Sequence, residues 1–134
     1  MKKALKLGFI LFITFVIVSC KKEMSISTLD GTWELRSVTG GQMAGASPNF
    51  EPGNGNQIKF NQQRYERYAD GKLVETGKYT LSPEKREVNN DEANFSMLSN
   101  NNFQQYIKLS SKKLVIFTGV IAADGIEEHY LKLK

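Results

Sequence analysis

Polar and apolar residues alternate along most of the chain after residue 30, with the period of strands rather than of helices. No segment shows a convincing helical period. We expect strands over residues 31–38, 57–60, 64–69, 72–82, 95–98, 103–109, 113–118 and 126–133. Because these segments follow one another at about ten-residue spacing with turns between them, they predict an all-β antiparallel barrel or sandwich. The pattern predicts seven or eight strands and leaves the choice between a barrel and a sandwich open.

Two aspartate–glycine pairs predict tight hairpin turns, because a type I′ turn needs positive φ at both central residues. The first pair is Asp70-Gly71 and the second is Asp124-Gly125. The strand that follows the first turn is expected to place Leu73, Gly77, Tyr79 and Leu81 on one face. A glycine in the middle of that strand predicts a bend or a bulge.

Two longer segments lack alternation and are predicted to be loops. Residues 39–56 contain five glycines and two prolines, and residues 83–94 are charged and rich in asparagine. Long loops in compact domains are often functional. We interpret residues 39–56 either as a flap over the mouth of the barrel, with Phe50 as its plug, or as a solvated excursion.

The first residues have the layout of an export signal. Lys2, Lys3 and Lys6 precede an apolar run from residue 7 to residue 19. That run is shorter than the roughly 20 apolar residues that span a membrane, and a cationic start followed by a short apolar core is typical of a secretory signal. We assign residues 1–19 to a signal peptide.

The signal ends Ile17-Val18-Ser19-Cys20, which resembles the lipobox of bacterial lipoproteins. The resemblance implies cleavage before Cys20, acylation of its thiol, and attachment to the outer membrane of a Gram-negative cell, on its periplasmic or surface face. Several acyl chains make a stable anchor. The alternative is an ordinary signal peptide with an unmodified cysteine. Residues 20–30 are expected to be a tether and residues 31–134 a single domain.

Composition narrows the functions that remain. Without Lys2, Lys3 and Lys6 the 18 basic residues fall to 15 against 14 acidic residues, so the exported part is near neutral and lacks the charge of a nucleic-acid-binding protein. The single cysteine excludes an intrachain disulfide, and the single histidine excludes a multi-histidine metal site. We expect neither a metal nor another cofactor, and we expect a monomer.

Gly31-x-Trp33 at the start of the first strand resembles the signature of lipocalins and their calycin relatives. In that family the tryptophan packs across the closed end of the barrel against a basic residue of the last strand. The resemblance therefore implies an all-β fold, a small antiparallel up-and-down barrel of seven to eight strands. It also implies a barrel-closing role for Trp33 with Lys132 or Lys134. The alternative is that Trp33 is a buried core residue of a β-sandwich.

The resemblance also implies a ligand in the barrel, and the side chains expected to face it are mostly large and apolar. These candidates are Leu35, Phe50, Phe60, Tyr79, Phe103, Ile107 and Tyr130. Small barrels are often filled by their own side chains, so a solid core and a ligand pocket both remain open. Our first hypothesis is binding of a small apolar or amphipathic molecule. The alternative is an envelope module that binds a protein or a glycan through its loops.

Catalytic patterns are weak in this chain. His129 shares a strand face with Glu127 and not with Glu128, and we interpret the pair as a solvated surface feature. No serine has the sequence context of a nucleophile elbow. The basic residues of one hairpin, Arg64, Arg67, Lys72 and Lys78, alternate with acids and tyrosines and predict a solvated hairpin of mixed charge. We expect no enzyme.

Overall fold

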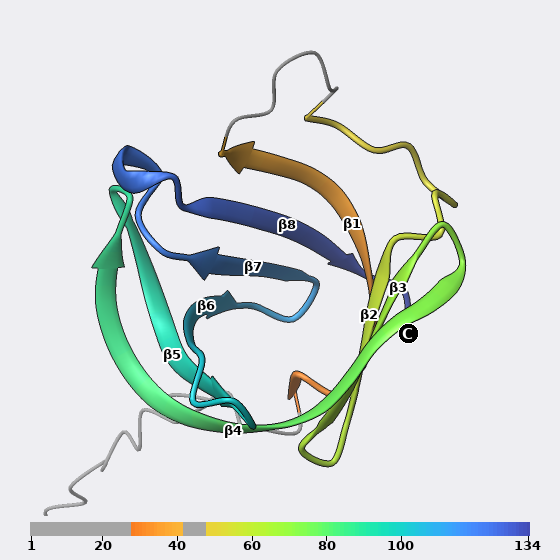
Figure 1. The fold of residues 1–134 in the computed structure, drawn as a ribbon, viewed down its shortest axis with the longest axis horizontal. Helices are drawn as coiled ribbons and strands as arrows, with labels where there is room; N and C mark the ends of the chain where they lie inside the picture. Colours follow the sequence, from red (N-terminus) through yellow and green to blue (C-terminus); the bar gives the residue numbers. More distant parts are fainter. Residues whose placement is uncertain (1–27, 42–47) are drawn as a thin grey trace, which may run out of the picture.

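The computed structural model describes residues 28–41 and 48–134, which form a closed antiparallel barrel (Figure 1). Its eight strands are β1 Gly31–Gly40, β2 Gln57–Asn61, β3 Arg64–Ala69, β4 Lys72–Val88, β5 Asp91–Ser99, β6 Gln104–Leu109, β7 Lys113–Thr118 and β8 Ile126–Lys132. Each strand pairs with the next along the chain, and β8 pairs with β1. The predicted all-β, up-and-down barrel is confirmed.

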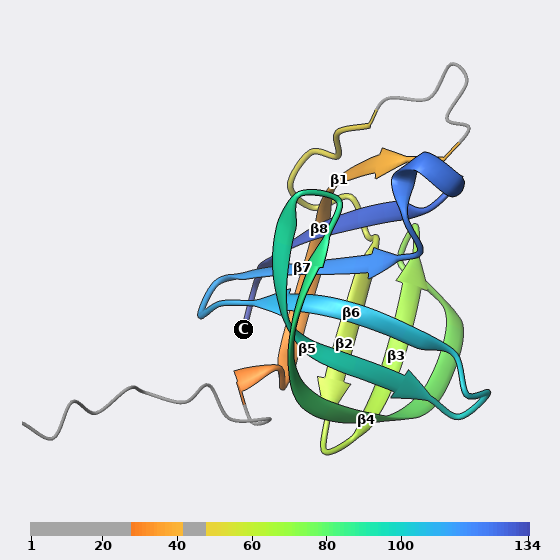
Figure 2. The same ribbon diagram turned by 90° about the vertical axis from the view of Figure 1, so that its left-hand side faces the viewer.

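The two ends of the barrel differ. Trp33 pairs with Lys132 where β1 begins and β8 ends, and we call this the closed end. Gly40 pairs with Ile126 at the opposite end, which we call the open end. Figure 2 shows β2 and β3 running across the direction of β6, β7 and β8, as in a strongly twisted barrel.

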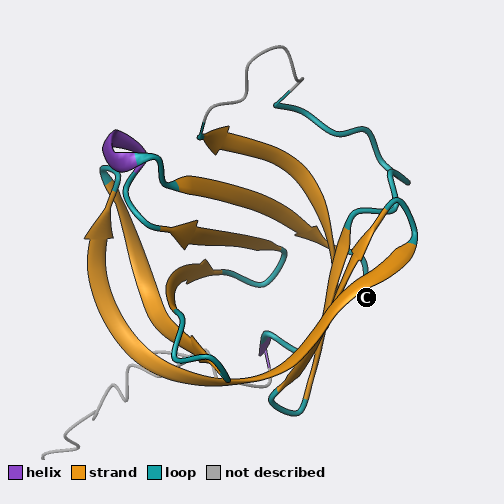
Figure 3. Cartoon of the chain, in the orientation of Figure 1, coloured by secondary structure: helices purple, strands orange, loops and turns teal. Residues whose placement is uncertain are grey.

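Strand alternation places one side of each strand in a common core. Ile58 and Phe60 of β2 point inward, as do Ile107 and Leu109 of β6, as the sequence predicts. Strands surround this core in Figure 3, and the described residues contain only short helical turns, such as η2 Ile121–Ala123. The buried cluster consists of Leu29, Trp33, Leu35, Ile58, Phe60, Tyr79, Leu81, Phe95, Met97, Ile107, Leu109, Leu114, Ile116 and Tyr130.

The predicted loop over residues 83–94 is wrong, because this segment is most of a long β-hairpin. β4 continues to Val88, and β5 begins at Asp91 after a turn at Asn89 and Asn90, whose φ values are 52° and 66°. Asparagine tolerates this left-handed conformation. The end of the hairpin folds over β6 and β7 (Figure 2). Ala93 of this hairpin and Phe117 of β7 belong to one buried cluster. The charged residues of the hairpin therefore belong to an exposed strand pair.

One of the two predicted hairpin turns is present in the structure, and the other is not. Asp70 and Gly71 have φ values of 49° and 77°, as a type I′ turn requires. The predicted hairpin turn at Asp124-Gly125 is wrong, because the connection from β7 to β8 runs from residue 119 to residue 125 and contains η2. Asp124 has the left-handed backbone conformation, but it is the C-cap of η2 and not part of a two-residue hairpin turn.

One prediction for β4 is wrong, and one alternative of a second prediction is excluded. Leu73 does not face the core and is 53% exposed, because the register shifts between Arg67 and Tyr68 and places Leu73 opposite Tyr68. Gly77 marks no bulge, because it pairs regularly with Tyr65. A Cβ atom on Gly77 would lie 2.6 Å from the Tyr65 ring, so the glycine makes room for that ring inside the barrel.

Candidate functional site

Trp33 lies at the closed end, where β1 begins, and its side chain is fully buried. Its indole Nε1–H donates to the carbonyl oxygen of Leu29 at 2.7 Å, and Nζ of Lys132 lies 5.0 Å from the ring centroid. Lys134 contributes its backbone, because its carbonyl oxygen accepts the Thr32 N–H at 3.1 Å. Leu29, in the expected tether, is fully buried and belongs to the fold. Cys20 lies outside the described residues.

The half of the barrel nearer the open end contains an ionic network that the sequence analysis missed. Nη1 of Arg67 donates to a carboxylate oxygen of Glu128 at 2.8 Å and to the hydroxyl of Tyr130 at 3.2 Å. The Tyr130 hydroxyl in turn donates to Glu128 at 3.1 Å. Glu75 lies 3.7 Å from Nε of Arg67 and accepts a hydrogen bond from Tyr65 at 2.5 Å.

Burial and neighbouring charges both shift the pKa values of this network. Burial alone would lower the pKa of Arg67, but Tyr130 and Glu128 outweigh it, so the pKa is raised and the guanidinium stays charged. Burial and the Glu128 carboxylate raise the pKa of Tyr130. Burial and the hydrogen bond to Glu75 raise the pKa of Tyr65 to about 12. At neutral pH the Arg67 guanidinium is therefore charged, and the phenols of Tyr65 and Tyr130 keep their protons.

Two small cavities share Arg67 as a wall. One, of about 120 Å³, lies between β3–β4 and β5–β6, and its lining is part apolar and part polar. The other, of about 140 Å³, lies between β1–β2 and β3 and reaches Glu128 and Tyr130. Both are smaller than the roughly 300–1,000 Å³ of typical ligand pockets. The first is lined by Ile58, Tyr65, Arg67, Glu75, Met97, Ser99, Phe103 and Gln105.

The ligand candidates from the sequence fall in three places. Leu35, Phe60, Tyr79, Ile107 and Tyr130 are buried in the core, and Leu35 and Tyr130 also line the second cavity. Phe50 is partly buried and packs against that core. Phe103 precedes β6, is 51% exposed and stands at the rim of the first cavity. The buried candidates form one cluster with Trp33 at the closed end.

Residues 48–56, part of the predicted flap, run along β1 instead of across the open end. Phe50 N–H donates to the Arg36 carbonyl oxygen at 2.8 Å, and Leu35 N–H donates to that of Asn56 at 2.9 Å. The buried Glu34 carboxylate accepts the Gly53 N–H at 2.9 Å and pairs with Arg36 at 2.6 Å. These bonds fix the segment beside β1, where β2 is too short to pair. Residues 42–47 lie outside the described part.

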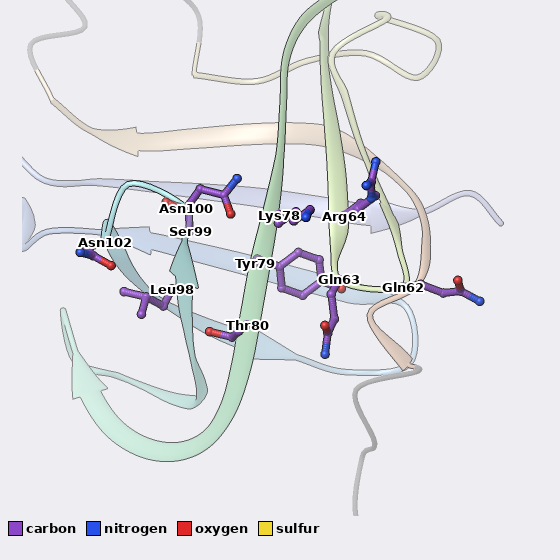
Figure 4. A pocket seen from close by; sticks show the side chains of 10 residues that line it. All are labelled: Gln62, Gln63, Arg64, Lys78, Tyr79, Thr80, Leu98, Ser99, Asn100 and Asn102. Atoms are coloured by element: carbon purple, nitrogen blue, oxygen red, sulfur yellow. The ribbon is translucent and has the colours of Figure 1, made fainter.

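A concavity of about 450 Å³ lies on the outer surface near the β2–β3 turn and is open to solvent. Figure 4 shows Gln62 and Gln63 on one side of β4 and Asn100 and Asn102 on the other. Arg64 and Lys78, which pair across β3 and β4, are its charged residues. The predicted solvated hairpin is thus correct for these two residues and wrong for Arg67, which points inward.

The network could have been found from the hairpin register. Gln62 and Gln63 form a two-residue turn with positive φ, so Phe60 lies opposite Tyr65 and Ile58 opposite Arg67. Opposed residues in an antiparallel pair share a face. Phe60 was expected to face the inside of the barrel, and Ile58, two residues earlier, lies on the same face of the strand. Arg67, opposite Ile58, therefore had to point inward as well.

No model of a known protein family matches the chain, and neither does any curated protein or solved structure. In the described ranges, 28–41 and 48–134, no group of histidine, cysteine and acidic residues is arranged to hold a metal ion. Nor does that part of the chain contain a helix long and apolar enough to cross a membrane.

Proposed function

We propose that this protein is a lipid-anchored, lipocalin-like barrel that binds a small amphipathic molecule at its open end without catalysis. The observation that carries the proposal is the ionic network around Arg67, which lies inside the barrel beside apolar side chains. Moving charged side chains from water into a protein interior costs desolvation free energy, and a buried ion pair adds little net stability. Charged side chains in a cavity therefore favour a role in recognition.

The volume of the first cavity limits the size of the ligand group that can enter it. An apolar cavity of about 150 Å³ holds a benzene ring, so about 120 Å³ admits a group of roughly six non-hydrogen atoms. Ile58 and Met97 offer apolar contacts, and the exposed ring of Phe103 extends them to the outside. A longer apolar tail would therefore lie along Phe103.

The charges favour a neutral or cationic head group. Arg67 is held by Glu128, whereas the Glu75 side chain is 53% exposed at the cavity. Two carboxylates against one guanidinium leave a formal charge of −1. A ligand amine that approaches Glu75 would gain a charge-assisted hydrogen bond. An anionic head group would be repelled by the net negative charge of the site.

Binding is favoured over catalysis because the polar side chains of the site already form hydrogen bonds with one another. Arg67, Glu128 and Tyr130 form a closed set of hydrogen bonds. Ser99 also lines the cavity, but its hydroxyl donates to the backbone oxygen of Phe103 and contacts no base among the described residues. A serine nucleophile would need a base at hydrogen-bond distance.

Calorimetric titration of the full chain in detergent with pentylamine, pentanol and pentanoate tests this proposal. We expect binding in the order amine, alcohol, carboxylate, and we expect Glu75→Gln to abolish the preference for the amine. Glu66→Gln, on the outer face of the same hairpin, is the matched control. No binding of any probe, or equal binding of amine and carboxylate, would contradict the proposal. Native mass spectrometry of protein from its own host would show a retained ligand directly.

The anchor is the second part of the proposal. Cys20 is followed by seven residues before the described chain begins at Thr28. Thr28 lies at the closed end, where its carbonyl oxygen accepts a hydrogen bond from Lys132 at 2.9 Å. Acyl chains on Cys20 would therefore attach the closed end to the outer membrane, and the open end would remain accessible.

A further inference from the structure

The first half of β4 has a free edge. β3 pairs with this strand from Lys72 to Lys78, but β5 pairs with it only from Tyr79 onward. Among the described residues, no backbone hydrogen bond reaches the second edge of residues 72–78. All of these residues except Gly77 are exposed to solvent. A strand that is open along one edge is a template for pairing with another chain.

The register shows which backbone groups face this edge. The Tyr79 N–H donates to the carbonyl oxygen of Gln63, on the β3 side, at 2.9 Å. Residues alternate along an antiparallel pair, so Gly77 and Glu75 also turn their backbone groups toward β3. Thr76 and Lys78 turn theirs away from it. The free edge therefore offers the N–H and C=O groups of Thr76 and Lys78.

Space adjoins the edge on both faces of the sheet. On the outer face, one hollow of about 370 Å³ is bounded by Thr76 and Lys78 on one side and by Asn100 on the other. On the inner face, the cavity of about 120 Å³ reaches from Glu75 to Phe103. An extended segment beside β4 could thus place alternate side chains inside and outside the barrel wall.

The two faces of the edge carry opposite charge. Glu75 faces inward, and the cation closest to it, Arg67, is already paired with Glu128. On the outer face Lys78 lies opposite Arg64. Opposite charges on neighbouring strands stabilise a sheet. A complementary strand would place a basic side chain inward and acidic side chains outward.

We propose that the β4 edge binds an extended peptide segment of another protein by β-strand addition, with basic residues facing in and acidic residues facing out. Exposed Leu73 and Val74 add apolar contact at one end of the edge. A second copy of this chain fits poorly. Antiparallel self-pairing centred on Glu75 would place Lys72 opposite Lys78 and the two Glu75 carboxylates opposite each other. This proposal does not depend on a ligand inside the barrel.

The test uses the full chain in detergent and a capped, fluorescent peptide, Thr-Val-Glu-Lys-Glu-Val-Thr. We expect saturable binding by anisotropy and at least tenfold weaker binding of the charge-swapped peptide, Thr-Val-Lys-Glu-Lys-Val-Thr. Thr76→Pro removes an edge N–H and should weaken binding at least tenfold. Thr76→Val keeps that N–H and should change binding less than twofold.

Hydrogen exchange in the wild-type chain gives a readout that does not depend on the variants. The peptide should slow exchange of the Thr76 and Lys78 amides and leave that of Gly77 unchanged. Unchanged exchange at Thr76 and Lys78, or equal binding of both peptides, would overturn the proposal. So would a dimer in sedimentation experiments that protects the same amides without peptide, because the edge would then belong to a second copy.

Discussion

The guanidinium of Arg67 and the carboxylate of Glu128 meet at 2.8 Å across the interior of the barrel. Their strands, β3 and β8, are not neighbours in the wall, because β1 and β2 lie between them. The pair therefore links two sides of the barrel near its open end. Tyr130 joins it through hydrogen bonds to both partners.

Arg67→Met should destabilise the fold by about 2–3 kcal/mol, because it leaves the Glu128 carboxylate buried without its partner. Replacing both members, as in Arg67→Met with Glu128→Leu, should recover most of this loss, since hydrophobic residues of similar volume often replace a buried pair without cost. Urea unfolding of the single and double variants measures the coupling. Additive losses would show that the two side chains do not depend on each other.

Trp33→Ala should cost about 3–5 kcal/mol of unfolding free energy, because it removes a large, fully buried aromatic ring. Lys132→Met should cost about 0.5–2 kcal/mol, the size of a cation–π contact. Trp33 is the single tryptophan of the chain, so its fluorescence reports on this site alone. Emission like that of free indole in the wild-type protein would contradict the burial described here.

Glu34→Ala should release residues 48–56 from β1, because the carboxylate binds both Gly53 and Arg36. Glu34→Gln keeps an acceptor for the Gly53 N–H but leaves Arg36 without its counter-ion, at a cost of about 1.5–3 kcal/mol. Exchange of the Gly53 amide should be fast in the alanine variant and slow in the glutamine variant. Equal exchange in the two variants would mean that Glu34 does not fix this segment.

Tyr79 should make stability fall at alkaline pH. Burial raises its pKa from 10.0 to about 12, so between these values the unfolded chain ionises while the folded chain keeps the proton. The unfolding free energy should therefore fall by up to about 1.4 kcal/mol per pH unit in that range. Tyr79→Phe should remove this contribution. It should cost little at pH 7, because the hydroxyl is buried without a hydrogen-bond partner in the described structure.

Cys20→Ala should abolish acylation if the lipobox assignment is correct. We expect an uncleaved or soluble precursor that incorporates no labelled fatty acid in the original host. Cell fractionation with metabolic labelling measures both properties, and Ser25→Ala in the adjoining segment is a suitable control. A Cys20→Ala protein that still carries label and sediments with membranes would exclude this anchor.

The alternation of side chains was enough to predict the barrel and much of its core. Ile58, Phe60 and Ile107 lie in regular strands in which neighbouring residues differ clearly in hydrophobicity, and all three are buried. The error over residues 83–94 has a physical cause. Both faces of that hairpin arm contain polar residues, so local hydrophobicity does not distinguish it from a loop, and its stability depends on contacts such as Ala93 with Phe117.

The ionic network was hidden for a different reason. Charged residues usually lie on the surface, and Arg67 was therefore grouped with Arg64 and Lys78. The register of the β2–β3 hairpin turns Arg67 inward, but only closure of the barrel brings it to Glu128 on β8, a strand distant in sequence. The free edge of β4 could not be predicted from the sequence either, because it depends on the residue at which β5 begins to pair with β4.

The seam between β1 and β8 joins the first and last strands, so residue 33 finds its partner about a hundred positions later. Such distant pairing makes folding slow, because loop entropy is lost before the contact forms. The wall cannot close until the final strand has left the ribosome. The barrel therefore cannot reach its native state from its first seven strands alone.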